Sequence, residues 1–211
     1  MKIIQNAIRI IFLLLFIFLT LKGNPMIWFI FFAISLLVAI FFGRIYCGYI
    51  CPMNTCMVFV NGSMKNHRND KRQVPYWLLN KQTPYIFLLL TIISVLVLKQ
   101  IFHVNLPIML IWIFISIFSV TIFKPYVFHN HICPFGVLQK LFSKSPIFSK
   151  AIDTQKCINC LKCQKVCNSN AINFNNSKLE INSSLCHQCQ DCTLTCPLDA
   201  INYRKKSRAN K

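Results

Sequence analysis

Eight cysteines in two runs of identical spacing are the residues of this 211-residue chain best suited to chemistry. Both runs read C-x2-C-x2-C-x3-C, and the second follows the first by 29 positions. The members are Cys157, Cys160, Cys163 and Cys167, then Cys186, Cys189, Cys192 and Cys196. The repeat continues beyond the cysteines, since Ala171-Ile172 recurs as Ala200-Ile201. Thiolates bind soft metals, so an internal duplication of this kind predicts two related metal centres.

The spacing is that of bacterial ferredoxins, in which the fourth cysteine of each run binds the cluster of the other run. We therefore predict two [4Fe–4S] clusters with exchanged ligands. One takes Cys157, Cys160, Cys163 and Cys196, and the other takes Cys186, Cys189, Cys192 and Cys167. Asn168 replaces the usual proline after Cys167, whereas Pro197 is present in the second run. Structural zinc sites use cysteine pairs with longer spacers, so zinc is disfavoured.

Long uncharged runs precede residue 124, in a chain that is 55% hydrophobic and holds 19 phenylalanines. Met26–Phe42 and Leu106–Phe123 approach the roughly 20 residues needed to cross a bilayer. Ile3–Leu21 contains Arg9, whose side chain we expect to reach the interface by snorkelling. Tyr85–Leu98 needs the residues up to Phe102 to complete a span. The pattern predicts an all-α domain of four transmembrane helices.

Charge predicts the orientation of these helices. With four spans, the side that carries both termini and the 43–83 loop holds 21 of the 23 Lys and Arg residues. The positive-inside rule places that side in the cytoplasm of a multi-pass cell-membrane protein. Disulfides between the cysteines are then unexpected, because cytosolic thiols stay reduced.

A second duplication follows the predicted second and fourth spans. Cys47-x3-Cys51-Pro52 recurs 82 positions later as His129-x3-Cys133-Pro134. Spacing of i and i+4 places both side chains of each pair on one helical face. Three interpretations remain open for Cys47, Cys51 and Cys133: a further cluster or metal with His129 or Cys56, a redox-active thiol pair, or simple packing.

The histidines also bear on the cofactors. None of the five lies in a predicted span, so paired axial histidines for a membrane haem are absent. His187, between Cys186 and Cys189, is expected to be exposed to solvent.

With four apolar spans, two C/H-x3-C-P motifs and a C-terminal double cysteine run, the chain resembles the NapH-type membrane ferredoxin family. His129 stands where that family has a cysteine. The resemblance implies electron exchange between a membrane quinone pool and iron–sulfur or haem partners, or an accessory role in the maturation of redox enzymes.

We expect a four-helix membrane domain over residues 1–145, a small α+β 2[4Fe–4S] ferredoxin domain over 146–203, and a basic tail over 204–211. Each repeat of the ferredoxin domain is expected to form a short hairpin and a short helix. The expected function is electron relay between a membrane redox partner, such as a quinol, and a cytoplasmic carrier or enzyme. The alternative is an accessory or anchor subunit that supplies electrons to a larger oxidoreductase. Either way the chain is an electron carrier or subunit rather than a stand-alone enzyme. The basic charge suits an acidic carrier and the bilayer, and nucleic acid is not expected.

Overall fold

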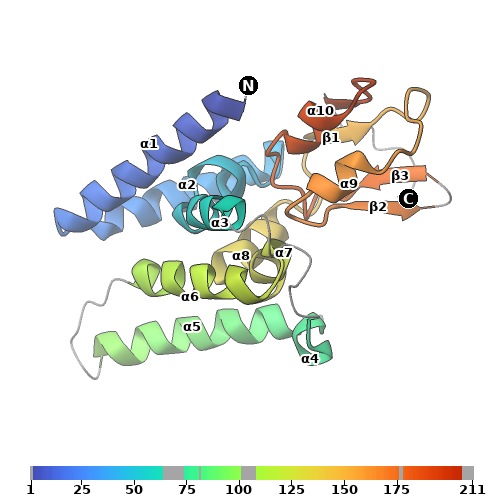
Figure 1. Cartoon of the computed structure of the whole chain (residues 1–211). Coiled ribbons are helices and arrows are strands. Elements are labelled where there is room, and N and C mark those ends of the chain that lie inside the picture. The colour runs from blue at the N-terminus through green and yellow to red at the C-terminus, as the bar shows by residue number, and fades with distance from the viewer. Residues whose placement is uncertain (1, 64–73, 81, 101–107, 176–177, 206–211) are drawn as a thin grey trace.

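The computed structural model describes residues 2–63, 74–80, 82–100, 108–175 and 178–205. Parts of three expectations lie outside these residues: residues 64–73 and 81 of the 43–83 loop, residues 101–107, which include the end of the third expected span and the start of the fourth, and residues 206–211 of the tail. The described chain forms a helical part and a smaller part of strands and short helices at one end of it (Figure 1).

The helical part consists of two chain segments with the same order of elements. The first comprises α1 (Lys2–Leu21), α2 (Pro25–Phe42), the π-helical turn η1 (Tyr46–Ile50) and α3 (Pro52–Ser63). After α4 (Tyr76–Leu79), the second comprises α5 (Thr83–Gln100), α6 (Ile108–Ile122), α7 (Pro125–Val127), the π-helical turn η3 (Phe128–Ile132) and α8 (Pro134–Phe142). Helix α3 packs on α6, and α2 packs on α8, so the two segments interlock.

Each C/H-x3-C-P motif lies on a π-helical turn that follows a long helix. The amide of Cys51 donates to the Tyr46 carbonyl at 2.9 Å, and the amide of Cys133 donates to the Phe128 carbonyl at 2.8 Å. The prolines then begin α3 and α8, where a missing amide proton costs no hydrogen bond. Within the 43–83 segment, the described residues form η1, α3 and α4, and α3 packs against α1 and α6.

The long helices are strongly apolar. Within the described residues, α1 alone is long and apolar enough to cross a membrane by length and composition, and the apolar helices at Met26–Phe42, Thr83–Val97 and Ile108–Ile122 are shorter. Their outward side chains are apolar and exposed, for example Leu37 at 61% and Phe114 at 71%. Arg9 differs from the expectation: it is 3% exposed and its Nε donates to the Gly48 carbonyl at 2.9 Å. Its side chain therefore points into the protein rather than snorkelling outward.

The smaller part is α+β. Its elements are β1 (Phe148–Ile152), α9 (Lys162–Val166), β2 (Ile172–Asn175), β3 (Lys178–Ile181), α10 (Asp191–Thr195) and β4 (Ile201–Lys205). Strand β1 pairs antiparallel with β4, and β2 pairs antiparallel with β3. The core between them contains Ile172, Leu179 and Ile201, each at most 2% exposed.

Each cysteine repeat is thus a β–α–β unit whose strands pair with those of the other repeat. A hairpin within each repeat, the simplest expectation from the sequence, is wrong. The reason is that the cysteine loop and helix separate the two strands of one repeat, whereas β2 and β3 are neighbours along the chain.

The two parts are joined at the C-terminal end of α2. The Phe42 ring stacks on Phe148 of β1 with centroids 5.7 Å apart. Tyr203 of β4 donates its hydroxyl proton to the Phe42 carbonyl at 3.0 Å. These contacts position the cysteine loops directly over the helical part.

Candidate functional site

The first cavity lies at the outer end of the α+β part. It has a volume of about 370 Å³ and an otherwise largely apolar lining that includes Leu161, Leu198 and Ile201. Its cysteines are three from the first run and one from the second: Cys157, Cys160, Cys163 and Cys196. The structure thus brings together the four residues expected to bind one cluster.

The second cavity repeats this arrangement with the roles of the runs reversed. Its volume is about 310 Å³. Its cysteines are Cys167 from the first run and Cys186, Cys189 and Cys192 from the second. We call the first of these sites the outer cavity and the second the inner cavity.

The backbone of the two cysteine runs is also duplicated. Six non-glycine residues of the described chain have positive φ, and they form three pairs at the 29-residue offset of the repeat: Asn159 with Gln188, Leu161 with Gln190, and Asn170 with Asp199. A non-glycine residue in the left-handed region is uncommon and persists where surrounding structure requires it. Here it turns each loop tightly enough to direct three successive cysteines into one cavity.

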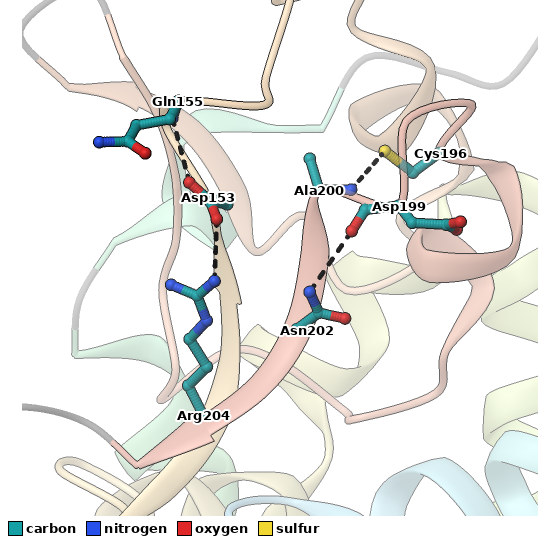
Figure 2. Close-up of polar contacts among 7 residues, drawn as sticks. All are labelled: Asp153, Gln155, Cys196, Asp199, Ala200, Asn202 and Arg204. Atoms are coloured by element: carbon teal, nitrogen blue, oxygen red, sulfur yellow. Dashed lines mark hydrogen bonds and ion pairs between the residues drawn. The ribbon is translucent and has the colours of Figure 1, made fainter.

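A backbone amide contacts the exchanged cysteine in each cavity. The Ala200 amide donates to Cys196 Sγ at 3.4 Å, as Figure 2 shows, and the Ala171 amide donates to Cys167 Sγ at the same distance. Hydrogen bonds from backbone amides to ligand sulfurs tune the reduction potential of an iron–sulfur centre. The Ala-Ile pair that occurs in both repeats therefore supplies both a sulfur contact and a core residue.

An ion pair ties the ends of the α+β part together. Arg204 of β4 donates to Asp153 at 2.9 Å, and the Gln155 amide donates to the other carboxylate oxygen at 3.1 Å (Figure 2). These bonds hold the pKa of Asp153 below its usual value. They join the strand before the first cysteine run to the strand after the second.

The donor set fits iron–sulfur clusters. All twelve cysteines are free thiols, and four converge on each cavity. No three His, Cys, Asp or Glu side chains of the described residues stand close enough to share one metal ion. Burial raises the pKa of Cys186 to about 12, so cluster binding must release thiol protons.

The surroundings of the two cavities differ. Around the outer cavity Cys160 is exposed and Ile158 is 67% exposed. Of the outer cysteines Cys163 alone is buried, whereas Cys186 and Cys192 of the inner set are buried. Two exposed lysines, Lys156 and Lys162, line the outer cavity. The inner cavity has one lysine, Lys150, which is buried, and the carboxylate of Asp191, which accepts from Cys189 Sγ at 3.3 Å.

The inner cavity faces the helical part through close backbone contacts. A Cβ added to Gly48 would collide with the carbonyl oxygen of His187. Tyr49 donates its hydroxyl proton to the Gln188 carbonyl at 3.3 Å, and Asn130 donates its side-chain amide to the Ser169 carbonyl at 3.0 Å. Both π-helical turns therefore dock on loops that carry inner-cavity cysteines.

His187 is buried, contrary to the expectation that it is exposed. It is 3% exposed and its ring meets that of His129 edge to face, with centroids 4.7 Å apart. Burial, and then the charge of Arg44, lowers the pKa of both imidazoles, that of His129 to about 3. Both rings are neutral at physiological pH. No local pattern predicts this contact, because it joins residues 58 positions apart.

The residues of the second duplication lie in the core of the helical part. Cys47, Cys51 and Cys133 are each at most 3% exposed and belong to the same buried cluster. The Gly136 amide donates to Cys133 Sγ at 3.4 Å. Cys56 lies on α3 and outside this buried cluster. The structure thus groups the three motif cysteines and leaves Cys56 apart.

His129, the fourth motif position, is engaged by other groups. Its Nε2 lies 3.0 Å from the side-chain oxygen of Asn54. Its carbonyl accepts from Arg44 at 3.4 Å. Sequence reasoning missed Arg44, which is fully buried among these residues. Its place three residues before Cys47 of the first motif was the available signal.

Comparison with known proteins agrees with the duplications. One family model, described as a 4Fe–4S binding domain, matches residues 24–75 and again 104–155. A second, described as a 4Fe–4S dicluster domain, matches residues 156–200. The chain is therefore a ferredoxin-type iron–sulfur protein, which supports an electron-transfer function.

A relative and the solved structures add little about function. The chain is 26% identical over 138 residues to an uncharacterised protein of Methanocaldococcus jannaschii, an alignment that covers 64% of this chain and 55% of that protein. The chain thus spans about half the length of this relative. No solved structure matches.

Proposed function

We propose that this ferredoxin-type protein is an integral membrane electron carrier with two [4Fe–4S] clusters, which passes single electrons between a membrane redox partner and a cytoplasmic one. The observation that carries the proposal is the pair of cavities, each surrounded by three cysteines of one repeat and one of the other. When bound, the clusters supply the one-electron chemistry, and the protein holds, shields and orients them.

The two cavities suit the two ends of such a relay. The inner cavity lies against the helical part, through the His187 contact with Gly48. The outer cavity has an exposed cysteine, Cys160, and exposed lysines, Lys156 and Lys162. A soluble acidic partner would approach this end, since opposite charge speeds association.

The membrane assignment rests on the helices and on charge. Long helices α1, α2, α5 and α6 expose apolar side chains outward, and the N-terminal end of α1 and the C-terminal end of α2 lie near the cysteine loops. This arrangement suits four spans with both termini and the ferredoxin domain in the cytoplasm. The shorter helices would need flanking residues to complete each span.

A cleft at the inner cavity supports a membrane-side partner. It has a volume of about 1310 Å³ and lies between α1, α3 and the cysteine loops, where Gln5, Arg9 and Asp191 line it. In an apolar helix, buried polar side chains are functional candidates by default. A quinol or another membrane-soluble reductant entering here would stand next to the loop that carries Cys189.

Anaerobic purification with iron and acid-labile sulfide determination, combined with electron paramagnetic resonance, tests the clusters. Two cubanes require about eight irons per chain. A colourless protein without sulfide would refute the proposal.

Protein reconstituted in vesicles and mixed with a quinol analogue tests the relay. Reduction of the clusters supports a membrane donor. Clusters that stay oxidised while a soluble enzyme partner copurifies in equal amounts would instead support the accessory or anchor role.

A further inference from the structure

A buried positive charge without a carboxylate partner lies between the helical part and the inner cavity. Arg44 is fully buried. One terminal nitrogen donates to the Asn130 side chain at 3.3 Å, and the other lies 3.8 Å from Cys47 Sγ and 3.4 Å from the His129 carbonyl. Its Nε has no partner. A guanidinium in such a position needs an anion close by.

The described acidic residues do not supply that anion. Asp153 pairs with Arg204, Asp191 accepts from Cys189, Glu180 accepts from Asn175, and Asp199 is exposed. A buried charge left uncompensated costs several kcal/mol, so folding with Arg44 in this place calls for negative charge from the cysteines beside it.

The three motif cysteines provide a suitable ligand set for such an anion. Cys47 and Cys51 come from the first segment and Cys133 from the second, and all three are buried in one cluster. Thiolates bound to iron carry net negative charge that a nearby cation stabilises. The family model that matches both segments is itself described as a 4Fe–4S binding domain.

We propose that Cys47, Cys51 and Cys133 hold a third iron–sulfur cluster, distinct from the two ferredoxin clusters, and that Arg44 is its counter-charge. His129 does not serve as the fourth ligand through Nε2, because that atom is paired with Asn54. The site therefore offers three thiolates and leaves one corner of the cluster without a cysteine.

The position of this site connects it to the inner cavity. Cys47 directly precedes Gly48, and Cys186 directly precedes His187, and Gly48 and His187 are in backbone contact. The His129 and His187 rings bridge the same boundary. A single electron leaving the third cluster would thus reach the inner ferredoxin cluster across one contact, with no bond made or broken.

Iron content of the full-length protein is the first test. A third cubane raises iron from about eight to about twelve per chain, a 1.5-fold increase. Cys133→Ser and Cys51→Ser should each lower iron by about one third while the resonance signals of the two ferredoxin clusters remain. The matched control is Cys56→Ser, which changes a cysteine of the same helical part that lies outside the buried cluster, and it should leave iron unchanged.

The role of Arg44 needs its own pair of variants. Arg44→Met should lose the additional iron, and Arg44→Lys, which keeps the charge, should retain more of it. Persisting ferredoxin signals report that each variant has folded. A wild-type protein with both ferredoxin signals and no iron beyond them would overturn this inference alone. Absence of all clusters would refute the proposed function instead.

Discussion

The outer and inner cavities have the same cysteine spacing, the same three left-handed turns and the same amide-to-sulfur bond, yet their surroundings differ. The outer cavity has an exposed cysteine and exposed lysines. The inner cavity is pressed against the helical part and has a buried lysine and a carboxylate. The duplicated sequence therefore determines how the cysteines are arranged around each cavity, whereas the packing of distant segments determines the surroundings of that cavity.

Removal of single cysteines should have the largest effect, because each change removes a ligand from one cavity only. Cys163→Ala and Cys196→Ala should abolish the same cluster signal, because both residues line the outer cavity. Cys186→Ala and Cys167→Ala should abolish the other signal. Each change should remove about four irons, measured with electron paramagnetic resonance and iron analysis. If Cys163 and Cys167 variants lost the same signal, the ligands would not be exchanged between repeats.

A bulkier residue at the docking contact should affect the inner cavity alone. In Gly48→Ala the new Cβ meets the His187 carbonyl, so the docking of the two parts should weaken by about 1–3 kcal/mol. Hydrogen exchange should then rise in the 186–192 loop and remain unchanged in the 157–163 loop.

Gly62→Ala is the matched control for this change, since a Cβ there meets nothing within 4 Å. An equal rise in hydrogen exchange in both loops of the Gly48 variant would contradict the assignment of this contact as the docking point.

Changes of charge near the cavities should shift the reduction potentials of the two clusters by different amounts. Lys150 is 7% exposed and its Nζ donates to Thr193, beside the inner cysteines. Lys150→Met should lower the reduction potential of the inner cluster, and Asp191→Asn should raise it. If each charge changes the free energy of one-electron reduction by about 1.4 kcal/mol, each shift is roughly 60 mV. Redox titration followed by electron paramagnetic resonance measures both.

Lys162→Gln at the outer cavity supplies the comparison for this measurement. This lysine is exposed, so solvent screens its charge and the shift should be smaller. Equal shifts at the two clusters would show that burial does not separate them electrostatically.

The smallest expected effect concerns the strand ends. Asp153→Asn removes the ion pair with Arg204 that joins the β1 and β4 ends. Because the folded-state pKa of Asp153 is lowered, the carboxylate stabilises the fold above its ordinary pKa and this contribution is lost as pH falls through the lowered value. At neutral pH the thermal midpoint should fall slightly, and less in high salt. A salt-independent decrease would point to the lost Gln155 turn bond instead.

Several features of the fold were predictable because they depend on local pattern. Apolar runs predicted the long helices, and the cysteine spacing predicted the tight loops, since both follow from neighbouring residues. Strand pairing was not predictable in the same way: β1 pairs with β4 across about 50 residues, and no local pattern specifies that choice. Helix α3 was missed because its polar and apolar residues show little separation onto faces.

The candidate site likewise has some features that the local sequence predicts and others that depend on tertiary packing. The repeat predicted which cysteines form sets, because equal spacing predicts similar loops, and the ferredoxin-type spacing predicted that the sets exchange one member. The burial of His187 and Arg44 and the alignment of Gly48 with the His187 carbonyl arise only when distant segments pack together. Solvent exposure and electrostatic environment depend on everything that surrounds a residue, so the tertiary structure decides them.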